Sequence, residues 1–268
     1  MKKTRPCIKG FVRRLVPCLL ATALMPCAAQ AKDYYWTNAS GDGVYTNAAN
    51  WNPVGLPETT DYTSDVVIFG TQGGTPTNVT RPAYSNPSWV KPQNMLHVRF
   101  DTAGWTLTAP TIDNLRTFES YGAGTNTVNF YFNMRDSQSW TIETGNTLHL
   151  AQTFYARNHT VTLNGGGTVL CSAPISGFGS GTYGVKIQNA VLKINGSTPS
   201  SFGAVTVVWI DKKEARLQLK TTVAAAKGLI GPTNKIRDNV GFGLKVTDVG
   251  GGCVEIAPQV LGTSIVVK

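Results

Sequence analysis

The chain has 268 residues, of which 41% are apolar and only 15% are charged, and it contains 28 glycines. This composition is too apolar and too poor in charge for a disordered protein, and it is typical of a protein built from strands and turns. Six of the 24 basic residues lie within the first 14 positions, and without them 18 basic residues face 15 acidic ones. The net charge of +9 is therefore no argument for nucleic-acid binding.

The first 31 residues have the pattern of an export signal. Basic residues end at Arg14, an apolar run extends from Leu15 to Met25, and Ala29-Gln30-Ala31 supplies small residues before a cleavage site. The apolar run is too short to span a bilayer, and no later stretch reaches membrane length. We expect cleavage after Ala31 and export of the mature chain to the periplasm, the cell surface or the medium.

Residues 32–92 are predicted to form an aromatic-rich N-terminal cap and a connector. Trp36, Tyr45 and Trp51 lie among glycines, prolines and asparagines, and Asp65–Gly70 reads as a buried strand followed by a turn. These aromatic residues have two interpretations. They form a small core that closes the end of a solenoid, or they stack on the sugar rings of a glycan. The stretch from Gly70 to Pro92 is rich in glycine and proline and is predicted to be a loop-rich connector.

Residues 93–268 are predicted to form a β-solenoid. The stretch Trp140–Gly196 repeats a unit of an alternating strand, a Gly/Asn corner and a second alternating strand. One such unit cannot bury its apolar face alone, so several must stack. One apolar residue from each unit gives a series with intervals of roughly 20 to 25 residues, the range of solenoid repeats. The series is Val128, Leu148, Val169, Leu192 and Leu217.

The pattern continues toward the end of the chain. Strands are predicted at Val205–Ile210 and Arg216–Leu219, with the charged corner Asp211–Glu214 between them. A helix from Asp211 to Lys227 is the alternative, and a short helix near Val223–Lys227 is compatible with the strands. Further strands are predicted over Leu244–Ile256 and Thr263–Val267.

Only two cysteines, Cys171 and Cys253, follow the signal. Export makes a disulfide chemically possible. In coils stacked about 4.8 Å apart the two residues lie two to three coils from each other, whereas a disulfide needs Cα atoms within about 7 Å. We favour two free thiols. A bond between them would instead favour a pair of β-sandwiches, which is the structural alternative.

The segments Gly165–Leu170 (GGGTVL) and Ala190–Asn195 (AVLKIN) resemble the autotransporter-associated β-strand repeats of secreted bacterial proteins. The opening from Trp36 through Asn50-Trp51 to Asp65–Phe69 is similar to the segment that often precedes such repeats. The resemblance covers nearly the whole mature chain. It implies a right-handed parallel β-helix in an extracellular or cell-surface protein, and it implies no catalytic residues. No membrane barrel or Pro-Glu-Pro sorting tail precedes Lys268, so attachment, release and retention in the periplasm all stay open.

Residues with the chemistry of an active site are sparse. A glycosidase needs two carboxylates flanking the scissile bond, and a calcium-assisted lyase needs a carboxylate cluster with a base. The acidic residues are scattered in the sequence, and Glu143 and Asp211, which lie at corners, are the strongest candidates. The three histidines have no metal-ligand spacing. His149 alternates with apolar neighbours and is predicted to point outward.

The sequence therefore predicts a non-catalytic, secreted or cell-surface β-solenoid acting in adhesion, matrix or surface-layer assembly. We expect no cofactor, metal, nucleic acid or membrane span, and extracellular glycans or surface proteins as partners. The first alternative is a carbohydrate-binding module that uses Trp36, Tyr45 and Trp51, helped by outward aromatics such as Tyr131 or Trp140. The second is a polysaccharide lyase or hydrolase.

Overall fold

The computed structural model describes residues 32–57, 65–81, 97–134, 136–177, 182–195, 207–241 and 243–259, except the side chains of residues 113 and 114. All of them belong to one compact unit, Ala31–Lys268. The predicted signal peptide, the glycine-rich segment 178–181 and the predicted strand Thr263–Val267 lie outside the described residues.

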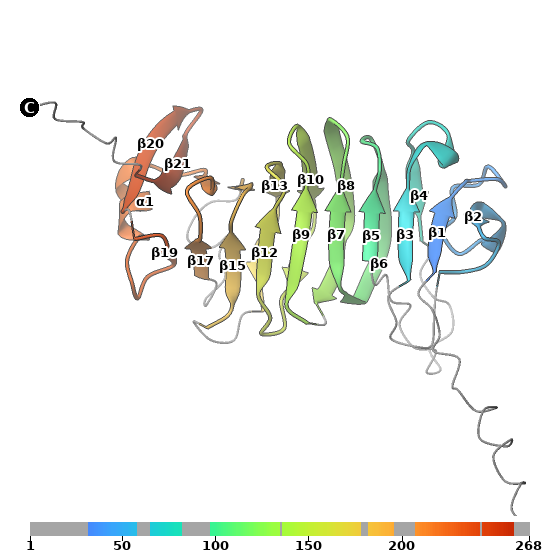
Figure 1. Ribbon diagram of the computed structural model, residues 1–268, viewed down its shortest axis with the longest axis horizontal. Helices are drawn as coiled ribbons and strands as arrows, with labels where there is room; N and C mark the ends of the chain where they lie inside the picture. The colour runs from blue at the N-terminus through green and yellow to red at the C-terminus, as the bar shows by residue number, and fades with distance from the viewer. Residues whose placement is uncertain are drawn as a thin grey trace, which may run out of the picture. The chain divides into compact units, whose positions relative to one another are not determined.

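Two sheets contain the described strands (Figure 1). The strands of sheet A, in the order in which they pair, are β19 (Ile236–Asp238), β17 (Val207–Ile210), β15 (Gly184–Ile187), β12 (Val161–Asn164), β9 (Gln138–Ile142), β7 (Thr117–Ser120), β5 (His97–Phe100), β3 (Val66–Phe69), β1 (Asp33–Trp36) and β2 (Trp51–Asn52). The strands of sheet B are β14 (Ile175–Ser176), β11 (Phe154–Tyr155), β8 (Gly124–Met134), β10 (Asn146–Leu150), β13 (Thr168–Cys171), β16 (Val191–Ile194), β18 (Arg216–Leu219), β21 (Cys253–Pro258) and β20 (Leu244–Gly250). In sheet B, β6 (Thr106–Leu115) also pairs with β8, and β4 (Asn78–Thr80) pairs with β6.

Each coil passes from a strand of sheet A through a tight corner into a strand of sheet B. Strand β9 leads to β10, β12 leads to β13, and β15 leads to β16. Equivalent strands of successive coils pair in parallel, as β10 does with β13 and β13 with β16. This pairing confirms the parallel β-solenoid and excludes the β-sandwich pair, whose sheets would be antiparallel.

The predicted repeat is correct except at its first position. The four later residues of the series lie opposite one another in neighbouring coils: Leu148, Val169, Leu192 and Leu217. The residue opposite Leu148 in β8 is Asn126, whereas Val128 pairs with Leu150. A pattern of apolar residues does not mark this position because a buried asparagine occupies it.

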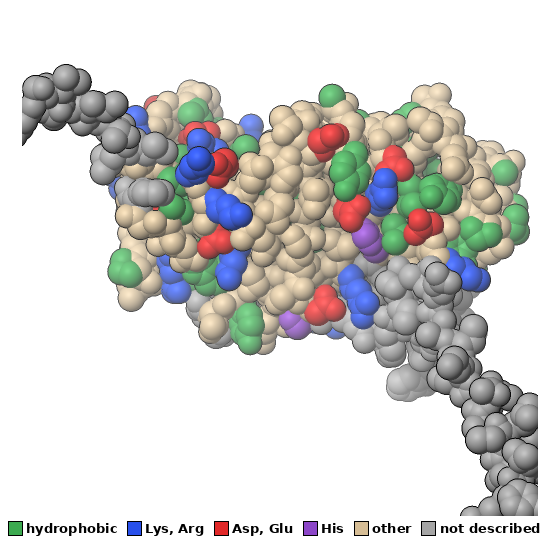
Figure 2. All heavy atoms as spheres, viewed as in Figure 1, with side chains coloured by type: hydrophobic (Ala, Val, Ile, Leu, Met, Phe, Trp, Pro, Cys, Tyr) green, Lys and Arg blue, Asp and Glu red, His purple; other side chains and the backbone are tan. Residues whose placement is uncertain are grey.

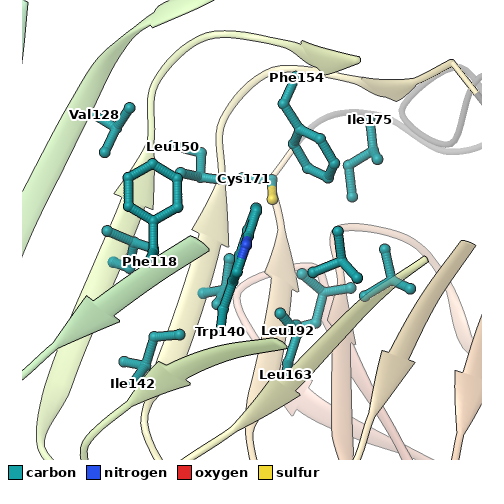
Figure 3. Packing of buried hydrophobic residues seen from close by; sticks show 14 of the residues in the cluster. Phe118, Val128, Trp140, Ile142, Leu150, Phe154, Leu163, Cys171, Ile175 and Leu192 are labelled. Carbon is teal, nitrogen blue, oxygen red and sulfur yellow. The ribbon is translucent and has the colours of Figure 1, made fainter. Parts of the chain in front are cut away.

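Alternating side chains of both sheets fill the interior of the coils (Figure 3). The rings of Phe118 and Trp140 meet edge to face with centroids 5.2 Å apart, and those of Phe132 and Phe154 stack at 5.4 Å. The prediction that Trp140 points outward is wrong. Its neighbours Ser139 and Thr141 face solvent, so alternation directs the indole into the core.

The N-terminal region continues sheet A. Strand β3 pairs in parallel with both β1 and β5, so the sheet crosses the predicted boundary at residue 93 without a break. Strand β2 is antiparallel to β1 and ends the sheet. The predicted loop-rich connector contains a 3-10 helix (Thr71–Gly73) and β4, and another 3-10 helix (Ala48–Asn50) precedes β2. The cap is therefore part of the solenoid.

The C-terminal described strands turn back on the stack. Strand β21 is antiparallel to both β18 and β20. Residues Arg216–Leu219 form a strand, as predicted, and not part of the longer helix that was the alternative. The short helix is present as α1 (Val223–Gly228), and the Thr222 hydroxyl caps it by accepting the Ala225 N–H at 3.2 Å. Within the described ranges, the helices are all too short or too polar to cross a membrane.

Candidate functional site

The three aromatic residues predicted to stack on a glycan are buried. The exposed fractions of Trp36, Tyr45 and Trp51 are 0%, 1% and 1%. Trp51 packs edge to face against both other rings, with centroids 5.1 Å and 4.9 Å apart, and its Nε1 donates to the Tyr45 carbonyl at 2.8 Å. A ring without an exposed face cannot stack on a sugar, so this prediction is wrong. These residues form the small core that was the other interpretation.

The outward face of sheet A differs along the stack in how many ionisable side chains it carries (Figure 2). Its middle coils carry uncharged side chains: Ser139 pairs with Thr162, and Thr141 pairs with Asn164. Ionisable side chains gather to either side of this area, over β5 and β7 and over β15 to β19. The group over β5 and β7 brings together residues that are distant in the sequence.

We call this group the Glu119 cluster; it consists of His97, Arg99, Asp101, Glu119 and Tyr121. Glu119 lies at its centre, with Oε1 3.1 Å from His97 Nε2 and Oε2 accepting the Tyr121 hydroxyl at 3.2 Å. Arg99 Nε donates to Asp101 Oδ1 at 2.6 Å, and the guanidinium lies over the Tyr121 ring, 5.4 Å from its centroid. The parallel register of β5 and β7 places Arg99 opposite Glu119.

The surroundings shift the pKa values of this cluster. Burial lowers the pKa of His97 below its ordinary value, although the nearby Glu119 opposes this effect. Burial, followed by the Glu119 charge, raises the pKa of Tyr121. The hydrogen bond to Asp101 raises the pKa of Arg99. His97 Nε2 lies 3.1 Å from Glu119 Oε1, and protonation of His97 would strengthen this charge contact.

The charged groups of the cluster are paired with one another. With His97 neutral it carries two carboxylates and one guanidinium, and protonation of His97 balances these charges. The carboxylates are engaged by Arg99, Tyr121 and His97. In the sequence Asp101 and Glu119 are far apart and were predicted to be scattered surface acids. The signal that would have found the cluster is the interval of one coil length, 20 residues, between Arg99 and Glu119.

Glu143 and Asp211, the candidate catalytic acids, form hydrogen bonds with neighbouring coils of the solenoid. Glu143 Oε2 accepts the backbone N–H of Gly122 in the preceding coil at 2.8 Å. Asp211 accepts from Gln188 at 2.9 Å and from Asn239 at 3.0 Å, in the coils on either side. Burial alone would raise the pKa of Asp211, but these two hydrogen bonds and nearby lysines lower it below its ordinary value. Both carboxylates join neighbouring coils.

The histidines and cysteines are separate from one another. The prediction that His149 points outward is confirmed, and its Nε2 lies 2.8 Å from the Ser172 hydroxyl. Across the described part of the chain, no three His, Cys, Asp or Glu side chains are grouped so that they could hold a metal ion. Cys171 is buried and Cys253 is partly exposed, and both are free thiols as predicted. Burial raises the pKa of Cys171 to about 12.

Comparisons with protein-family models, with curated proteins and with solved structures gave no match.

Proposed function

We propose that this chain is an exported, non-catalytic β-solenoid that acts in adhesion, matrix or surface-layer assembly. The observation that carries the proposal is that the carboxylates of the solenoid form hydrogen bonds and ion pairs with the protein itself. Glu143 and Asp211 each bind a neighbouring coil, and Glu119 and Asp101 are held within one charge network. These acids stabilise a rigid stack with outward polar faces, which suits a scaffold. The predicted export signal and the resemblance to autotransporter-associated repeats support the same function.

The distribution of charge along the stack supports assembly in particular. Residues 32–181 contain 7 basic and 10 acidic residues, whereas residues 182–268 contain 11 basic and 5 acidic residues. Figure 2 shows lysine and arginine side chains crowded over β15 to β19. Opposite charge at the two ends of a stack favours contact between the acidic part of one copy and the basic part of another.

Export is tested with the full chain carrying a C-terminal tag in a Gram-negative host. Mass spectrometry of the exported protein should show Lys32 as its first residue. Full-length protein confined to the cytoplasm, with residues 1–31 intact, would contradict the proposal.

Assembly is tested by sedimentation velocity of the exported protein at several salt concentrations. We expect larger species at low salt that dissociate as salt rises, because screening weakens contacts between exposed charges. Adhesion of bacteria or coated beads that display the chain is measured in parallel. A chain that is monomeric under all conditions and does not adhere would refute both roles.

The enzymatic alternative needs its own measurement. The chain is incubated with neutral and acidic polysaccharides, and we expect neither new reducing ends nor unsaturated products. Product formation that Glu143→Gln or Asp211→Asn abolishes, while the variant keeps the wild-type melting temperature, would replace the scaffold proposal with an enzyme.

A further inference from the structure

Two exposed tyrosines lie on the same outward face of neighbouring coils in sheet B. Tyr131 and Tyr155 are each 45% exposed. Tyr155 of β11 pairs with Asn133 of β8, and Tyr131 precedes Asn133 by two residues, so alternation places both phenol rings on one face. With parallel strands about 4.8 Å apart and a rise of about 3.3 Å per residue, such diagonal neighbours lie about 8 Å apart, within reach of one ligand.

The support under this tyrosine pair is rigid. Phe132 follows Tyr131 and Phe154 precedes Tyr155, and both phenylalanines point inward, where their rings stack 5.4 Å apart with an interplanar angle of 6°. The Trp140 ring packs against the Phe154 ring in this core, with centroids 5.5 Å apart. The backbone that presents the tyrosines is therefore fixed on the inside, which lowers the ordering cost of binding.

The immediate neighbours of the tyrosines in the sheet are polar and uncharged. Thr111 lies opposite Tyr131, and Asn133 and Ser176 flank Tyr155 on either side. An entirely apolar partner would desolvate these polar groups without replacing their hydrogen bonds. A partner with apolar ring faces and many hydroxyl groups satisfies both kinds of surface.

We infer that Tyr131 and Tyr155 form a binding platform for a neutral polysaccharide built of pyranose rings. The C–H faces of the sugars pack on the two phenol rings, and their hydroxyl groups bond to the exposed Thr111 beside Tyr131. The side chains paired with the two tyrosines carry no charge, which favours neutral chains over acidic ones. The inference rests on the proposed function and gives it a class of partner.

The probes are dextran, a soluble mixed-linkage β-glucan and a galactomannan, with polygalacturonate as the acidic comparison. Affinity electrophoresis of the exported full chain should show retardation by at least one neutral probe. Tyr131→Ala and Tyr155→Ala should each weaken that binding about tenfold, the equivalent of about 1.4 kcal/mol, and the double variant should abolish it. Tyr131→Phe and Tyr155→Phe should keep most of the affinity because each retains the ring.

Tyr183→Ala is the matched control, since Tyr183 is 36% exposed and precedes β15 of the other sheet. It should bind like the wild type, and all variants should keep the wild-type circular dichroism spectrum. Equal loss of binding in Tyr183→Ala would overturn the platform. So would unchanged binding by the double alanine variant, or binding of the acidic probe alone.

Failure of this inference is distinguishable from failure of the proposed function. If no neutral probe binds while the exported chain still adheres or assembles, the tyrosine platform is refuted and the scaffold role stands. If export or both of the scaffold measurements fail, the proposed function is refuted whatever the glycan result.

Discussion

Ser120 and Asn146, 26 residues apart in the chain, form a hydrogen bond in the interior of the coil stack. The Ser120 hydroxyl donates to Asn146 Oδ1 at 2.7 Å and accepts from Asn126 Nδ2 at 3.1 Å. Asn126 Oδ1 in turn accepts the backbone N–H of Trp105 at 3.0 Å. All three polar side chains are buried. The network joins three successive coils at one corner.

Replacing Asn146 with alanine should destabilise the protein. The change leaves the buried Ser120 hydroxyl without its acceptor and the partly buried Tyr121 carbonyl without the Asn146 donor. We expect a loss of about 1–3 kcal/mol in the free energy of unfolding, measured by urea denaturation. Thr147→Ala, at the adjacent outward position, is the control and should change little. A loss in Asn146→Ala below about 0.5 kcal/mol, the size of ordinary surface effects, would show that the network adds no net stability.

Trp51→Ala should test the aromatic core at the N-terminal end. Removal of a buried indole that contacts Trp36, Tyr45 and Phe69 should cost about 3–5 kcal/mol in the free energy of unfolding. Val54→Ala alters an exposed side chain nearby and should be nearly neutral. Equal stability of the two variants in thermal unfolding would contradict the assignment of Trp51 to the core.

Gly165→Ala should disrupt the corner between β12 and β13. Gly165 has φ of +98°, and an added Cβ would meet the backbone carbonyl of Ile142 in the preceding coil. Left-handed strain and overpacking together should cost about 2–4 kcal/mol. Gly228→Ala is the control, since its Cβ would meet open space and its φ is not left-handed. Comparable urea midpoints for both variants would show that the corner tolerates a side chain.

The two thiols should differ in reactivity. Cys171 is buried and its pKa is raised to about 12, so little reactive thiolate exists near neutral pH, whereas Cys253 is partly exposed. Native protein treated with iodoacetamide at about pH 8 should be labelled at Cys253, and Cys171 should react only after denaturation. Peptide mass spectrometry assigns the labels. Rapid labelling of native Cys171 would mean that this part of the interior opens readily.

The stability of the protein should fall as the pH is lowered through the ordinary pKa of His97, which is 6.5. Burial lowers the pKa of His97 in the folded state, so the unfolded chain takes up the proton first and acid favours unfolding. The decline should level off below the folded-state pKa. The charged groups that act on His97 are Glu119 and Asp33, which favour its protonation, and Arg99, which opposes it.

Urea denaturation between about pH 7.5 and pH 5.5 measures this decline. His97→Gln should flatten it, and Glu119→Gln should enlarge it because the carboxylate that supports the protonated form is gone. The imidazole titration followed by NMR gives the pKa directly. A folded-state pKa above the ordinary value would reverse the sign and refute the assignment.

Local patterns predicted the coils well. Alternation marked β12, β13 and β16, and the glycines after Asn164 marked the corner between β12 and β13, because both signals depend on a few adjacent residues. Patterns of apolar residues failed at Asn126, which fills an apolar position through bonds to Ser120 and Trp105. Those partners come from other strands or corners, so no apolar periodicity reveals them.

The sequence by itself determined the solenoid, because strand alternation and glycine corners are properties of neighbouring residues that only stacking can bury. Tertiary structure decided between the two interpretations of the N-terminal aromatic residues, and it made Trp36, Tyr45 and Trp51 part of the core. Tyr131 is exposed as predicted, and the register of the coils places Tyr155 on the same face. The same register brought Arg99 opposite Glu119. Coil length sets that register, and coil length is a property of the packed stack.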